Sequence, residues 1–237
     1  MFKDEANRAI VHTFARKVRN QDEVPLEFRI LPNNIGYLRL TSFNTSKVVE
    51  LFDSLFSTIS STNALIIDIR ANGGGSSQYG YEIAGRLTDK PFWTSWAITR
   101  SYRPSSRAWG GDAVKIDITR WDWKPYKPEP YTSPVVLLVG PSTYSAAEDF
   151  TVVFKNMERG LILGSATGGS TGQPLGYDLP GGGLGFVCSK RDVEPSGEEF
   201  VGQGIVPSRI VEPTLEGIRK GRDEVLDAAL DFLRRSH

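Results

Sequence analysis

Three short, uninterrupted apolar runs constrain the fold of this chain more than any other feature. They are ALIIDI (64–69), VVLLV (135–139) and LILG (161–164). Runs this short, without polar alternation, indicate strands that are buried on both faces. Helical patterns precede and separate them. An apolar stripe at Lys47–Ile59 lies before the first run, and further helices are predicted through Tyr81 and Leu87 and after Ser145. This strand–helix–strand order predicts an α/β fold with a mostly parallel sheet.

The two ends of the chain complete a single predicted domain over residues 1–237. Residues 1–33 are interpreted as an N-terminal helix (1–20) and a linker broken at Pro25, ahead of a strand at Ile35–Leu40. The C-terminal part is predicted to be short and β-rich, with strands at Leu184–Ser189 and Ile205–Val211, before a final helix at Asp223–Arg235. No segment of the size of a PDZ domain is found in the chain.

Residues 91–131 form an aromatic-rich insertion. All five tryptophans lie there, and within it only Val114–Thr119 resembles a strand. Aromatic residues outside a periodic core cover a binding cleft or a partner subunit, or they form a small core of their own. We therefore expect Trp93 and Trp121 to contact substrate, and a homo-oligomer contact through 91–131 is the alternative.

The composition excludes several classes of function. Lysine plus arginine equals aspartate plus glutamate at 28 each, so nothing predicts nucleic-acid binding. Two histidines and one cysteine are too few for the usual zinc sites, and no metal or cofactor is expected. The cysteine, Cys188, lies in a strand-like run and is predicted to be buried and inert. No apolar run is long enough to span a membrane, and the N-terminus shows no signal peptide.

Ser145 is the first candidate for chemistry. It follows the buried run 135–139 in the segment PSTYSAAED, where a helix is predicted to begin. A hydroxyl at a helix N-terminus lies beside free backbone N–H groups, which can stabilise the oxyanion of an acyl-transfer reaction. Ser145 with Glu148 three residues later also matches a capping box, which requires no catalysis. Asp149 is interpreted in the same way, as a helix cap in preference to a pocket residue.

The glycine turn IDIRANGGGSS is the second candidate. Three glycines directly after a buried strand permit positive backbone dihedral angles and close approach of another segment. Consecutive N–H groups in such a turn can bind an anion, although the turn lacks the pattern of a phosphate loop. Asp68 and Arg70 at its start are predicted to form an internal ion pair that braces it.

Taken in order, five segments make the sequence recognisable. GYLRL (36–40), ALIIDIRANGGG, STYSAAED, GLILGSATGGSTGQP and VGQGIVPSRIVEP follow one another as in the carboxyl-terminal processing, or tail-specific, serine peptidases, and the chain resembles their tricorn-like branch. The resemblance implies a crotonase-like (Clp-protease-like) fold. It also implies Ser145 as nucleophile, with Ala146 and Gly73 or Gly74 as oxyanion donors. Members of this family are most often periplasmic or secreted.

The general base does not match the family pattern. In the main branch a lysine follows the serine by about 25 residues, and here Ser170 occupies that position, with Gln173 at about the place of an orienting glutamine. A hydroxyl cannot replace an amine as a base at neutral pH. The tricorn-like branch instead uses a histidine and a glutamate, for which His12 and Glu199 are the candidates in this chain.

The sequence therefore predicts a serine-type hydrolase that cleaves peptide substrates through Ser145 and a backbone oxyanion hole. Two alternatives remain open on the same fold. One is a non-catalytic module that binds a ligand or peptide, which the missing lysine and the tryptophans favour. The other is an esterase-like hydrolase of small acyl substrates, because a weak base suits reactive esters better than amides.

Overall fold

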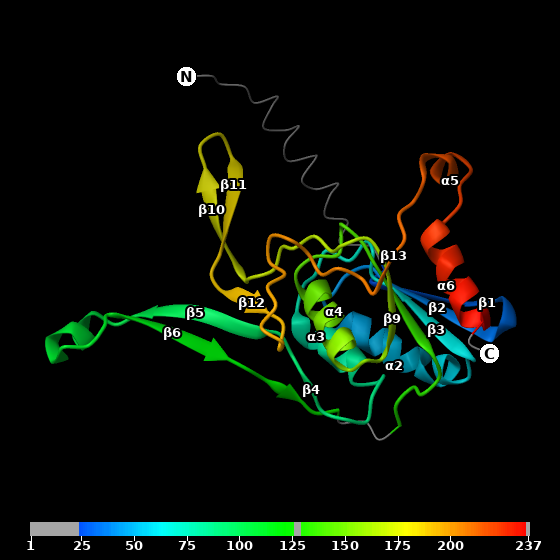
Figure 1. Cartoon of the computed structure of the whole chain (residues 1–237), viewed down its shortest axis with the longest axis horizontal. Coiled ribbons are helices and arrows are strands. Elements are labelled where there is room, and N and C mark those ends of the chain that lie inside the picture. Colours follow the sequence, from blue (N-terminus) through cyan, green and yellow to red (C-terminus); the bar gives the residue numbers. More distant parts are fainter. Residues whose placement is uncertain (1–23, 126–128, 236–237) are drawn as a thin grey trace.

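The computed structural model describes residues 24–125 and 129–235, and its central element is a six-stranded sheet (Figure 1). The strands lie in the order β1 (Leu26–Leu31), β2 (Ile35–Leu40), β3 (Ala64–Asp68), β8 (Val135–Val139), β9 (Gly160–Gly164) and β13 (Arg209–Ile210). β1 is antiparallel to β2, and every other neighbouring pair is parallel. The predicted α/β fold with a mostly parallel sheet is confirmed.

Helices cover both faces of this sheet. One face packs against α2 (Lys47–Ser60), α3 (Ser77–Ala84) and α4 (Ala146–Asn156), and the other packs against α6 (Glu224–Arg235). Alternate residues of β8 contribute to the two cores, since Leu137 faces the three helices and Leu138 faces α6. Burial on both sides explains why the strand is apolar throughout.

Two hairpins extend away from the sheet (Figure 1). β5 (Trp96–Tyr102) pairs with β6 (Val114–Thr119) and also with β12 (Arg191–Val193), while β10 (Pro174–Leu179) pairs with β11 (Gly183–Cys188). The shorter elements are β4 (Phe92–Trp93), β7 (Asp122–Trp123), the 3-10 helices η1 (Pro32–Asn34) and η2 (Pro104–Trp109), and α5 (Leu215–Arg219). The insertion thus holds four strands, where the sequence indicated only Val114–Thr119. The two-residue strands β4 and β7 are too short to show a period of alternation.

Three other expectations need correction. Residues 26–31 form the edge strand β1 and not a linker. The strand expected at Ile205–Val211 shrinks to Arg209–Ile210, because Ile205 pairs with Thr167 and Pro207 has no N–H to donate. Cys188 is exposed and not buried, because its hairpin stands away from the core.

The predicted helix at 1–20, together with His12, lies outside the described residues. Within the described part of the chain, no helix is long and apolar enough to cross a membrane.

Candidate active site

Ser145 occupies a sharp turn between β8 and α4. Its backbone dihedral angles, φ 53° and ψ −122°, lie in a region that residues other than glycine rarely adopt. The preceding turn is fixed by Thr143, whose hydroxyl donates to the carbonyl of Ile69 (3.0 Å) and accepts from the N–H of Gly140 (3.1 Å). A backbone held in such a conformation by its surroundings is typical of functional sites.

The half-buried side chain of Ser145 lines a cavity of about 570 Å³. The walls come from α3, from the hairpin β5–β6 and from the segment that leads into β10, and they include Trp121, Thr171 and Gln173. Ala146 is the first residue of α4, where backbone N–H groups have no partner within the helix. A substrate carbonyl in this cavity would therefore meet a hydroxyl and a helix N-terminus together.

The glycine turn packs directly against Ser145. A Cβ atom on Gly74 would lie 2.7 Å from the Cβ of Ser145 and 2.8 Å from the carbonyl oxygen of Tyr144, and Gly74 has a φ of 100°. Only glycine fits there. The N–H of Gly74 donates to Oδ1 of Asn72 at 2.9 Å, so an oxyanion would share or displace that contact. Gly73 has open space at its Cβ position.

Glu148 joins Ser145 to the loop that follows β9. Its buried carboxylate accepts hydrogen bonds from the N–H of Ser145 (3.2 Å), the hydroxyl of Thr167 (2.6 Å) and the N–H groups of Gly169 (2.7 Å) and Ser170 (2.9 Å). Burial raises the pKa of Glu148, and these four donors oppose the rise. The predicted capping box is present, but the glutamate also holds a second segment.

Ser170 contributes its backbone to this arrangement. Its carbonyl accepts from the N–H of Ser145 at 3.1 Å, while its own N–H donates to Glu148. The residue at the position of the family lysine therefore touches the turn of the predicted nucleophile. Ser170 itself is exposed to solvent.

Three charged side chains line the same cavity, and sequence reasoning did not assign them to the site. They are Asp149, Lys190 and Asp192. Asp149 accepts from the hydroxyls of Ser77 (2.5 Å) and Ser95 (2.9 Å), so it is a cavity residue and not the helix cap that was predicted. One signal was present in the sequence, because Asp149 follows Ser145 by four residues and therefore shares its helix face.

The remaining predicted residues lie apart from one another. Trp121 and Gln173 line the cavity with Ser145. Trp93 is half-exposed on β4, is not among the residues that line the cavity, and accepts from the side chain of Asn156 through its carbonyl. Glu199 forms an exposed ion pair with Arg191, and it too is not among the lining residues.

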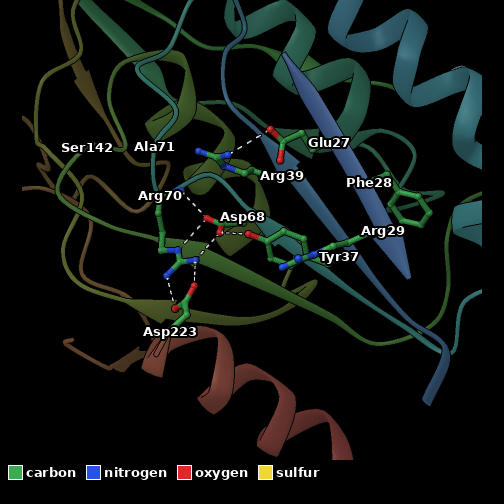
Figure 2. Close-up of a pocket in the computed structure, with 10 residues that line it drawn as sticks. All are labelled: Glu27, Phe28, Arg29, Tyr37, Arg39, Asp68, Arg70, Ala71, Ser142 and Asp223. Atoms are coloured by element: carbon green, nitrogen blue, oxygen red, sulfur yellow. Dashed lines mark hydrogen bonds and ion pairs between the residues drawn. The ribbon is translucent and has the colours of Figure 1, made fainter. Parts of the chain in front are cut away.

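A second hollow, of about 660 Å³, lies at the ends of β2 and β3 near the N-terminus of α6 (Figure 2). Arg70 forms ion pairs with Asp68 (2.6 Å) and Asp223 (2.7 Å), which confirms the predicted pair and adds a partner directly before α6. The hydroxyl of Tyr37 also donates to Asp68 at 2.6 Å, and burial, followed by this carboxylate, raises the pKa of Tyr37. Arg70 thus bonds to both carboxylates, so the network braces the strand end before the glycine turn.

Comparisons with known proteins match most of the chain, including the candidate site. The model of peptidase family S41 matches residues 34–211. The chloroplastic C-terminal processing peptidase of Tetradesmus obliquus is 29% identical over 78% of this chain and 38% of its own length. The chain thus spans well under half of that relative.

Two solved structures are similar in fold. A protein from Parabacteroides merdae superimposes with a TM-score of 0.74 and 27% identity, covering 88% of this chain and 64% of that one. A photosystem II D1 C-terminal processing protease gives a TM-score of 0.58 and 25% identity over 85% of this chain and 53% of its own. The predicted Clp-protease-like fold is confirmed by these neighbours.

Proposed function

The chain belongs to peptidase family S41, and from this premise we propose that it is a serine-type hydrolase that cleaves polypeptides through Ser145. One observation carries the proposal. Ser145 has a strained backbone at the N-terminus of α4, and its side chain lines a cavity large enough for a substrate segment. A helix cap needs no such backbone, whereas an exposed nucleophile on a sharp strand-to-helix turn does.

The geometry assigns a role to each backbone group around Ser145. Its hydroxyl oxygen attacks the substrate carbonyl, and the resulting oxyanion accepts hydrogen bonds from the N–H of Ala146 and from Gly73 or Gly74. The leaving amine departs with a proton, and water then hydrolyses the acyl-enzyme. Loss of such groups lowers rates by factors on the order of 10² or more.

The proton acceptor is a separate part of the proposal. Lys190 lines the cavity, but its ammonium donates to Asp192 at 2.5 Å, so we do not assign it as the base. His12 remains the prediction for this role, with Glu199 as its carboxylate partner, as the tricorn-like resemblance implies. Ser170, at the position of the family lysine, is a hydroxyl and is not assigned as the base.

The substrate is proposed to be the C-terminal region of a polypeptide, as the names of the relatives suggest. Trp121 at the cavity wall would contact the extended chain. The contact between copies through 91–131 remains a proposal too, and the exposed Ile116 and Ile118 of β6 are among the apolar side chains available for it.

A fluorophosphonate probe tests the nucleophile. We expect one adduct, on Ser145, in the wild-type protein and none in Ser145→Ala. Ser142→Ala is the matched control, because this exposed serine three residues earlier lies beside the second hollow, and it should leave the labelling intact. Peptides that carry a fluorophore and a quencher should be cleaved only by the variants that the probe labels. A folded wild-type protein that is not labelled, or is labelled elsewhere, would contradict the proposal.

A further inference from the structure

Two carboxylates and one ammonium gather in the cavity that contains Ser145. Asp149 lies on α4, Lys190 directly precedes β12, and Asp192 lies within β12. Both aspartates are buried, with 4% of Asp149 and 1% of Asp192 exposed. Among the residues that line this cavity, all of them described, Lys190 is the only cationic one. Formal charges therefore leave one negative charge in excess.

The hydrogen bonds of the two aspartates differ. Both oxygens of Asp149 accept from hydroxyls, those of Ser77 and Ser95. Asp192 accepts from Lys190 through Oδ1 only, and its buried Oδ2 has no hydrogen-bond partner among the described residues. A buried carboxylate oxygen without a donor carries an uncompensated desolvation cost. A ligand that supplies the missing donor would recover that energy.

The two aspartates raise the pKa values of groups around them. Burial raises the pKa of Asp149, and the neighbouring Asp192 raises it further. Burial also raises the pKa of the Tyr81 hydroxyl, with Asp149 and Asp192 adding to it. A cation placed near Oδ2 of Asp192 would be attracted by both carboxylates.

We propose that this cavity contains a subsite for a cationic substrate side chain, lysine or arginine, whose head group binds Oδ2 of Asp192. The subsite rests on the proposed function, since it names the side chain that Ser145 would meet beside the scissile bond. Ammonium and guanidinium groups are donors that form strong bonds to carboxylates. The aliphatic stem of such a side chain would lie along the ring of Trp121, which is half-exposed on the cavity wall.

Binding can be measured without catalysis in the Ser145→Ala protein. The probes are two capped nine-residue peptides that differ only in a central lysine or norleucine, titrated by calorimetry and by tryptophan fluorescence. We expect the lysine peptide to bind at least about tenfold more tightly, a factor that corresponds to about 1.4 kcal/mol. Equal affinities, or no binding of either peptide, would overturn the subsite.

Two further substitutions act in opposite directions. Asp192→Asn in the same background should reduce the preference to within about twofold, while Lys190→Gln should increase it by removing the cation that competes for Asp192. Asp231→Asn, an exposed aspartate on α6 across the sheet, is the matched control and should keep the preference. If Asp192→Asn keeps the preference for the lysine peptide, the proposal fails. If Asp192→Asn and Lys190→Gln both lose this preference, the role of Asp192 is structural and the proposal fails as well.

Hydrolysis is measured separately, in the protein that retains Ser145. A lysine preference in binding without cleavage or fluorophosphonate labelling would contradict the proposed function and leave the subsite standing. Labelling and cleavage without a lysine preference would contradict the subsite alone.

Discussion

The backbone N–H of Ser145 donates to the carboxylate of Glu148, with 3.2 Å between the nitrogen and Oε2. The same carboxylate accepts from Thr167, Gly169 and Ser170, so one buried acid joins the turn of the predicted nucleophile to the loop after β9. This loop carries the residue that stands in place of the family lysine. Glu148 therefore acts as a positioning residue.

Glu148→Gln should lower both stability and reactivity. A glutamine amide offers one acceptor oxygen, and its NH₂ group would face N–H donors that it cannot satisfy. We expect a loss of about 2–4 kcal/mol in the free energy of unfolding, measured with denaturant, and slower labelling of Ser145. Glu216→Gln, an exposed glutamate on α5, is the control and should change stability by less than about 0.5 kcal/mol. Similar losses in both variants would refute the role assigned to Glu148.

The sequence predicted the sheet and the nucleophile turn because both are encoded locally. Fully buried strands such as β8 are continuous apolar runs, and the Ser145 turn follows one directly. The glycine turn was equally visible, because three consecutive glycines follow shortly after the buried strand β3. Local patterns are sufficient wherever neighbours in sequence are also neighbours in space.

The three charged residues that line the cavity could not be predicted from local patterns. Lys190 and Asp192 line the same cavity as Ser145 because β12 pairs with β5, and no periodic signal marks that pairing. Asp149 was interpreted as a helix cap, since the serines that bind it lie on α3 and before β5. The edge strand β1 was missed because exposed strands lack a burial pattern.

Gly74→Ala and Gly73→Ala should differ sharply in stability. The new methyl group at position 74 would lie 2.7 Å from the Cβ of Ser145, in a backbone conformation with a φ of 100°. At position 73 the space is open. We expect a loss of about 2–4 kcal/mol for Gly74→Ala and less than about 1 kcal/mol for Gly73→Ala, measured by chemical denaturation. Equal effects would mean that the turn does not pack against Ser145 as described.

The stability of the protein should depend on Asp149 in a defined direction of pH. Burial, and then the charge of Asp192, raises the pKa of Asp149 above that of the unfolded chain, so the folded protein binds this proton more tightly. The contribution of Asp149 is therefore greatest below its unfolded pKa, about 4, and is lost as the pH rises through the folded value. Relative to Asp149→Asn, the wild-type protein should become more stable as the pH falls from 8 towards about 4. A difference that is constant across this range would count against the burial of this charge.

Arg70→Lys tests whether the network in Figure 2 supports the glycine turn. The guanidinium of Arg70 donates to both oxygens of Asp68 and both oxygens of Asp223, a geometry that a lysine ammonium cannot reproduce. We expect a loss of about 1–3 kcal/mol in unfolding free energy. Arg222→Lys, in the exposed pair with Asp227, is the matched control and should cost less than about 1 kcal/mol.

The same variant should affect the predicted nucleophile from a distance. Residues 71–74 follow Arg70 directly and end against Ser145, so a loosened strand end should displace the oxyanion donors. Labelling of Ser145 by the fluorophosphonate should therefore slow by about tenfold in Arg70→Lys and stay unchanged in Arg222→Lys, because misplacement by even 1 Å weakens catalysis. If Arg70→Lys loses stability but labels at the wild-type rate, the network supports α6 alone and the glycine turn is held by Asn72 and Tyr144.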